Sequence, residues 1–153
     1  MRNLRLILAV IGLAAVLGAA DPFVGVWKLN VAKSDFKSGP VPRQQITTIT
    51  EAAGETRIRI DGIASDGTTT LVDYSIPTNG GMGKMEKSAA YDGVRARMIG
   101  PGEREISRLK DGKVVYTVVG KLAADGKSIT TVSKGLNPMG KPVEASLVYD
   151  RVK

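Results

Sequence analysis

The sequence predicts an all-β protein, an antiparallel up-and-down β-barrel of eight to ten strands. Turn dipeptides recur along the chain, and the runs between them are rich in β-branched and aromatic residues without a sustained helical period. A meander with this many strands removes its exposed edges by closing on itself, which favours a barrel over an open sheet. The turn dipeptides are Asp61-Gly62, Asp66-Gly67, Asn79-Gly80, Asp92-Gly93, Asp111-Gly112 and Asp125-Gly126.

Residues 1–20 have the pattern of an export signal. Arg2 and Arg5 precede the apolar run 6–17, and small residues at 18–20 come before Asp21. The apolar run is shorter than the ~20 residues that a membrane-spanning helix needs. We therefore expect cleavage after Ala20 and a periplasmic or secreted product without a membrane span, with an uncleaved anchor as the alternative.

Residues 21–153 are enough for a single domain with one core. The chain has no cysteine, so packing and strand pairing must stabilise it without disulfides. Its net charge of +7 is spread among acidic residues and forms no basic block, so we expect no nucleic-acid partner. The sequence leaves the oligomeric state open.

The first strand is expected within residues 23–31. Phe23, Gly25, Trp27, Leu29 and Val31 alternate onto one face, as in a half-buried strand. Two prolines and a glycine exclude a strand from residues 32–42. A crossing loop should follow there, with room for one helical turn at 32–36, and it should place Phe36 at one end of the fold.

Eight further strands are expected between the turns. Alternation places apolar side chains on the inner face and Arg57, Arg59, Arg95 and Arg97 on the outer face. Arg151 is then the arginine whose strand phase puts it on an apolar face. The expected strands are 45–52, 56–63, 68–76, 93–99, 103–109, 113–122, 128–134 and 142–152. The expected inward residues are Ile58, Ile60, Val72, Tyr74, Ile76, Val94, Ala96, Met98, Val114, Tyr116, Val118, Leu122, Ala145, Leu147 and Tyr149.

The motif Gly25-Val26-Trp27 at the start of the first strand resembles the Gly-X-Trp motif of the calycin superfamily, which includes lipocalins and fatty-acid-binding proteins. The longer run over residues 25–40 looks like the opening of small secreted bacterial lipocalin-like proteins. This resemblance implies that Trp27 closes the barrel floor and that Arg151 packs across its ring. It leaves the carboxylate-binding role of the fatty-acid carriers in doubt, because Tyr149 and Arg151 stand here in reverse order.

Catalysis is not expected. The chain has no histidine and no cysteine, which excludes the common triads, thiol nucleophiles and zinc sites, and we expect neither a metal nor a cofactor. A buried acid pair such as Asp73 with Asp61 is one alternative, and solvated turn or strand-surface acids are the other.

The glycine-rich stretch 79–84 has three interpretations. A phosphate-binding loop is disfavoured because the Walker spacing is absent. A flexible loop over the barrel mouth is favoured, since four of the five residues from Asn79 to Gly83 are Gly or Asn. A plain hairpin loop is the third interpretation.

The expected function is non-catalytic binding of a small apolar or amphipathic molecule inside the barrel. The candidate ligand-binding residues are Tyr74, Tyr116, Tyr149, Arg151 and Trp27, of which Trp27 and Arg151, with Gly25, also form the structural motif. Two alternatives remain: a structural or protein-interaction role with a packed interior, such as an inhibitor, and a histidine-free isomerase or cyclase.

Overall fold

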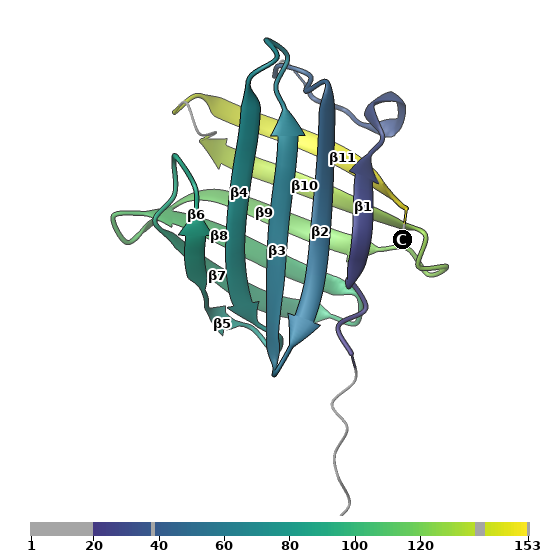
Figure 1. The fold of residues 1–153 in the computed structure, drawn as a ribbon, viewed down its shortest axis with the longest axis vertical. Helices are drawn as coiled ribbons and strands as arrows, with labels where there is room; N and C mark the ends of the chain where they lie inside the picture. Colours follow the sequence, from purple (N-terminus) through teal and green to yellow (C-terminus); the bar gives the residue numbers. More distant parts are fainter. Residues whose placement is uncertain (1–19, 38, 137–139, 153) are drawn as a thin grey trace, which may run out of the picture.

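A computed structural model describes residues 20–37, 39–136 and 140–152, and it confirms the all-β barrel. The described residues form eleven strands in one antiparallel sheet (Figure 1). The strands are β1 (Gly25–Leu29), β2 (Gln44–Ala52), β3 (Glu55–Ile63), β4 (Thr69–Pro77), β5 (Gly81–Met82), β6 (Lys84–Lys87), β7 (Gly93–Gly100), β8 (Glu103–Lys110), β9 (Lys113–Leu122), β10 (Ser128–Leu136) and β11 (Pro142–Arg151). Of the predicted export segment, only Ala20 lies within the described residues.

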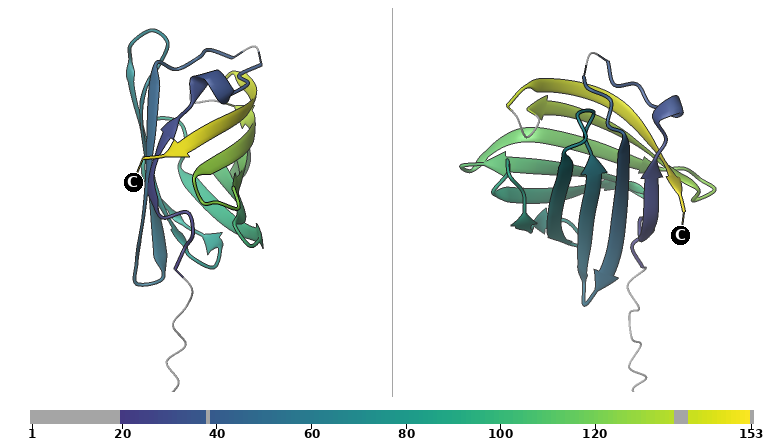
Figure 2. Two further views of the ribbon diagram at one scale, coloured as in Figure 1. Left: turned by 90° about the vertical axis from the view of Figure 1, so that its right-hand side faces the viewer. Right: turned by 45° about the horizontal axis from the view of Figure 1, so that its top comes forward.

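The sheet folds into two layers that face each other. Strands β1 to β4 form one layer and β7 to β11 the other, and the strands of the two layers cross steeply (Figures 1 and 2). On one side the layers join directly, because β1 pairs with both β2 and β11. In this pairing Trp27 lies opposite Arg151, which brings the two ends of the strand sequence together.

On the other side, one interrupted strand nearly closes the barrel. Strand β6 pairs with β4, and β5 pairs with β7, with Gly83 between the two halves. The Gly83 N–H donates to the Val94 carbonyl at 2.9 Å, and a Cβ at position 83 would collide with the backbone oxygen of Ser75. The prediction of a flexible loop over the barrel mouth at residues 79–84 was therefore wrong, because β5 and the start of β6 lie within it. Long-range pairing makes short strands from a glycine-rich stretch with little strand propensity, which raises the strand count to eleven.

The core lies between the two layers. Its largest fully buried side chains include Trp27, Phe23, Ile76 and Val94. Most inward assignments hold: the predicted inward residues Ile58, Tyr74, Ile76, Val94, Ala96 and Tyr149 are buried.

Three inward predictions fail where the backbone leaves regular alternation. Val31 is exposed because a 3-10 turn, Val31–Lys33, begins there. Met98 is exposed next to a register shift between Met98 and Gly100. Val114 is exposed where the pairing of β9 with β8 shifts between Arg108 and Leu109.

The segment between β1 and β2 contains the only helical turn among the described residues. Its Asp35 bridges to Ser146 of β11, and half-buried Phe36 packs against the core, as predicted. No helix in the described ranges has the length and apolar composition that crossing a membrane requires.

The outer face carries the four predicted outward arginines, all exposed. Arg57 binds Asp73 with two hydrogen bonds of 2.9 and 2.7 Å, and Arg59 binds Asp61 with two of 2.8 Å. Both acids therefore belong to ion pairs on the strand surface, although Asp73 itself is buried beneath its partner.

Candidate ligand-binding site

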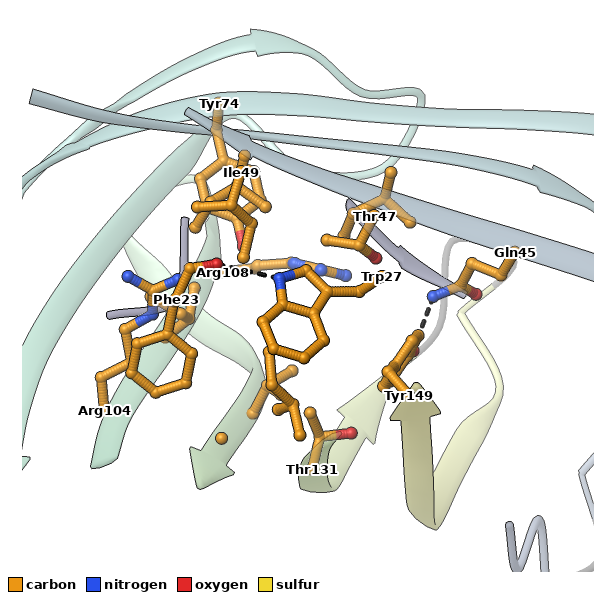
Figure 3. A pocket seen from close by; sticks show the side chains of 16 residues that line it. Phe23, Trp27, Gln45, Thr47, Ile49, Tyr74, Arg104, Arg108, Thr131 and Tyr149 are labelled. Atoms are coloured by element: carbon orange, nitrogen blue, oxygen red, sulfur yellow. Dashed lines mark hydrogen bonds between the residues drawn. The ribbon is translucent and has the colours of Figure 1, made fainter. Parts of the chain in front are cut away.

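A cavity of about 110 Å³ lies between the two layers of the barrel (Figure 3). Eight strands and the residue Phe23 ahead of β1 contribute to its wall. The apolar part comes from Phe23, Trp27, Ile49, Ile58, Ile60, Ile106, Val118 and Ile129, with Gly120. The polar part comes from Gln45, Thr47, Tyr74, Arg104, Arg108, Thr131 and Tyr149. A mostly apolar wall with a few converging polar groups is typical of a small-molecule site.

Arg108 is the polar group with the most unusual surroundings. Its guanidinium carbon lies 5.1 Å from the ring centroid of Tyr116, 5.3 Å from that of Tyr91 and 5.8 Å from that of Tyr74. Its Nε is the one buried side-chain nitrogen or oxygen among the described residues that has no hydrogen-bond partner. No ion pair formed by those residues includes Arg108.

Three aromatic faces stabilise this guanidinium but leave its charge without a counter-ion. Cation–π contact contributes on the order of 1 kcal/mol per good pair, which does not replace the water lost on burial. Tyr91 and Tyr116 also pack on each other, with ring centroids 6.1 Å apart, and the Tyr91 hydroxyl donates to the Leu136 carbonyl at 3.1 Å. The aromatic cage around Arg108 is therefore fixed by its own contacts, and the guanidinium keeps a donor free.

Tyr149 and Gln45 form a second polar point on the wall. Gln45 Nε2 donates to the Tyr149 hydroxyl at 2.7 Å, and burial raises the pKa of that hydroxyl well above its usual value. Tyr149 is thus a neutral phenol across the physiological range. It accepts from Gln45 and keeps its own proton for a further acceptor.

The floor of the cavity is held by cation–π pairs. Trp27 is fully buried, its Nε1 donates to the Phe23 carbonyl at 2.9 Å, and the Arg151 guanidinium lies 4.1 Å from its ring centroid. Arg104 lies 4.2 Å from the Phe23 ring centroid and pairs with Asp21 at 2.8 Å. Unlike Arg108, Arg104 has its charge neutralised within the floor.

Comparison with known proteins supports the fold. No protein-family model matches the sequence, and no curated protein sequence matches it. Among solved structures, the chain is similar to zebrafish ileal bile acid-binding protein in complex with cholic acid, with a TM-score of 0.53 over 86% of this chain and 99% of that chain. The fold is calycin-like. The two sequences are only 12% identical, so the likeness concerns the fold, and the ligand of this calycin-like barrel must be argued from its own cavity.

The residues singled out in the sequence lie in different parts of the calycin-like barrel. Tyr74, Tyr149 and Trp27 line the cavity. Tyr116 is not part of the lining but contacts Arg108. Arg151 lies against the Trp27 ring, and its hydrogen bonds go to backbone carbonyls, so it supports the floor.

The prediction that Arg151 lies on an apolar face is confirmed, since its guanidinium lies 4.1 Å from the Trp27 ring centroid. The prediction that it is the one arginine to do so was wrong, because Arg104 and Arg108 also point inward. Both share one face of β8 with Ile106, and all three line the cavity. This alternation is visible in the sequence. The inward direction of Arg104 and Arg108 could not be predicted from it, because the opposite face of β8 carries Glu103 and Glu105 and neither face is apolar.

Two other features of the calycin-like barrel do not qualify as sites. A depression of about 390 Å³ on the outer face of β2 to β4 has threonines, apolar side chains and Asp61, but Asp61 is already paired with Arg59. Within the described ranges, no three acidic side chains gather in a way that could hold a metal ion.

Proposed function

We propose that this protein binds a small amphipathic anion inside its barrel, with the apolar part of the ligand against the isoleucine wall and its anionic group at Arg108. The observation that carries the proposal is the buried Arg108 Nε without a partner. A guanidinium in this position is expensive unless a charged or strongly accepting group meets it, and a bound carboxylate provides such a group.

The polar groups around the cavity favour an anion over a neutral ligand. Arg108 can only donate, and Tyr149 has a proton free once Gln45 occupies its oxygen. Among the described residues, no carboxylate lines the cavity, so a cation would meet Arg108 without a compensating negative charge. The aromatic rings around Arg108 shield it from water and strengthen its interaction with an anion.

The volume limits the ligand. A cavity of about 110 Å³ is somewhat smaller than the ~150 Å³ cavity that holds a benzene molecule. A carboxylate with about four carbons, which has as many non-hydrogen atoms as benzene, fits this scale.

Trp27 provides the readout for a binding test, because it is the only tryptophan and lines the cavity. Butanoate, 1-butanol and butylamine share an apolar chain and differ in charge. We expect butanoate to change the Trp27 fluorescence at the lowest concentration, butanol to bind at least about tenfold more weakly, and butylamine not to bind. Isothermal titration calorimetry should give the same order.

The matched variants are Arg108→Gln and Arg95→Gln. Arg108→Gln should remove the preference for butanoate over butanol, whereas Arg95→Gln, at an exposed arginine on β7, should leave it unchanged. Equal binding of all three probes would refute an anion site while leaving an apolar site in place. Binding of none of them at millimolar concentration would support a packed interior with a structural role.

A further inference from the structure

The buried part of the chain begins at Asp21. Ala20 is exposed, whereas Asp21 is only 6% exposed. The Asp21 carboxylate accepts hydrogen bonds from the Phe23 N–H at 2.9 Å, the Thr56 hydroxyl at 2.9 Å and Arg104 Nη1 at 2.8 Å. Three hydrogen bonds therefore hold the Asp21 side chain in the barrel floor.

The backbone nitrogen of Asp21 faces a carboxylate. It donates to Glu51 Oε2 of β2 at 2.8 Å, and the other oxygen of the same carboxylate, Oε1, accepts from the Thr78 hydroxyl at 3.2 Å. Glu51 is half-buried and takes part in none of the ion pairs between described residues. A half-buried carboxylate that meets only neutral donors is a site prepared for a cation.

We propose that the peptide bond between Ala20 and Asp21 is a processing site, and that the amine released at Asp21 forms an ion pair with Glu51 that locks the barrel floor. A signal-peptide-cleaving protease adds water across this bond. The C–N bond breaks, the Ala20 carbonyl carbon gains the hydroxyl, and the Asp21 nitrogen gains a proton. At neutral pH this nitrogen binds one more proton and becomes an ammonium 2.8 Å from Glu51 in the arrangement described.

The structure distinguishes this bond from its neighbours. Cleavage one residue earlier would leave the amine on exposed Ala20. Cleavage one residue later would remove Asp21, leaving Arg104 buried without its partner. Only cleavage after Ala20, where small residues end the export pattern, places the new charge against Glu51.

The charges around the new amine decide its pH dependence. The amine would face Glu51 of β2. It would also face the Asp21 side-chain carboxylate, which is already paired with Arg104 of β8. Arg151 of β11 is the other nearby charge, and it donates to the Pro22 carbonyl at 3.3 Å. The nearest unpaired charge is Glu51, so pairing raises the amine's affinity for protons in the folded state. The stabilisation is complete below the unfolded amine's pKa of about 7.7 to 8.0 and disappears as the pH rises through the higher folded value.

The first test is the identity of the N-terminus. The full chain, expressed with residues 1–20 in a host that has a signal peptidase, should be recovered as residues 21–153 by intact mass and N-terminal sequencing. A different first residue, or an uncleaved chain, would overturn the proposal.

The second test is a double-mutant cycle between the N-terminus and Glu51. One chain begins at Asp21, and a second retains Ala20, which moves the amine into solvent. Residues 21–152 supply all eleven strands and the core, so both chains contain the whole fold. Each is compared with its Glu51→Gln variant by urea unfolding at pH 6.5 and pH 10.5.

At pH 6.5, Glu51→Gln should lower the folding equilibrium constant about tenfold more in the chain that begins at Asp21 than in the chain that retains Ala20. At pH 10.5 this difference should vanish. Glu55→Gln, at an exposed acid on β3, is the control and should show no coupling. Equal effects of Glu51→Gln in both chains at pH 6.5 would overturn the ion pair.

A comparison without substitution keeps the proposal testable if the Glu51→Gln variants do not fold. The stabilities of the two chains that keep Glu51, one beginning at Asp21 and the other at Ala20, are then compared. A stability difference between them that disappears by pH 10.5 supports the pair, and a difference that stays constant with pH contradicts it.

Discussion

The Arg151 guanidinium lies 4.1 Å from the centroid of the Trp27 ring, and the two residues are direct partners across the β1–β11 pair. Besides this contact, Arg151 donates from Nε to the Gly126 carbonyl and from Nη1 to the Val24 carbonyl, both at 2.7 Å. One side chain therefore ties the first strand, the last strand and the β9–β10 turn together.

Replacing Arg151 should weaken this junction. Arg151→Met keeps a long apolar stem but loses all three hydrogen bonds and the cation–π contact, and we expect a loss of about 2 kcal/mol in the free energy of unfolding. The stability of Arg151→Lys should lie between those of the original protein and Arg151→Met, because one ammonium cannot reach the Gly126 and Val24 carbonyls in the same geometry. Urea unfolding followed by Trp27 fluorescence measures this series. A lysine variant as stable as the original protein would mean that charge alone matters at this position.

Two arginines of β8 should respond in opposite directions to the same substitution. Arg104→Met removes the partner of buried Asp21, which leaves an uncompensated charge and should cost about 3 kcal/mol. Arg108→Met removes a buried guanidinium that has no carboxylate partner among the described residues, and it should stabilise the protein by about 1 kcal/mol while abolishing the preference for butanoate. Thermal and urea unfolding of the ligand-free proteins provide the comparison. A large loss of stability in Arg108→Met would show that the aromatic cage alone compensates the charge.

The Asp73–Arg57 pair should contribute to the acid limit of stability. The hydrogen bonds from Arg57 lower the pKa of Asp73, and burial opposes this only in part. Because the folded-state pKa is depressed, the stabilisation is present above the unfolded value of about 3.9 and is lost as the pH falls through the folded value. Asp73→Asn should therefore cost about 1 kcal/mol at pH 7 and almost nothing at pH 2.5. Unfolding curves at the two pH values test this, and an equal loss at both would exclude an ionic origin.

The barrel seam at Gly83 should tolerate no side chain. A Cβ there would meet the Ser75 carbonyl and lie 2.9 Å from Ile76 Cγ2, so Gly83→Ala should cost about 2 kcal/mol or separate β5 and β6 from their neighbours. Gly100→Ala, where a Cβ would meet nothing within 4 Å, is the matched control and should be neutral. Urea unfolding compares the two variants, and hydrogen exchange of the β5 and β6 amides reports whether the seam has opened. Equal stability of the two alanine variants would contradict this close approach.

The fold was readable from the sequence because turn dipeptides and alternation are local signals. The nine predicted strand segments all appear, with ends that differ by a few residues. Strands β5 and β6 could not be predicted from the sequence, since the glycine-rich stretch has little strand propensity. These two short strands form only because β4 and β7 present free edges to them.

The site was only partly readable. Tyr74 and Tyr149 followed from alternation on otherwise apolar strands, but Arg108 lies on a strand with charges on both faces. Its inward direction depends on how β8 pairs with β7 and β9. Tyr116 is its partner across the β8–β9 hairpin, but Tyr74 and Tyr91 come from segments earlier in the chain. No local pattern encodes that meeting.

Because β1 pairs with β11, the first and last strands of the chain are neighbours in the barrel. The same arrangement of strands could therefore be built by a chain that starts at a different strand. The Val152 N–H donates to the Val26 carbonyl at 2.8 Å, so a short linker could join the two ends and new termini could be opened in an exposed turn such as Asp111-Gly112. Such a circular permutant would keep every strand pairing but would have an amide in place of the amine at Asp21. It would therefore separate the stability that comes from the sheet from the stability that depends on having a chain end at this position.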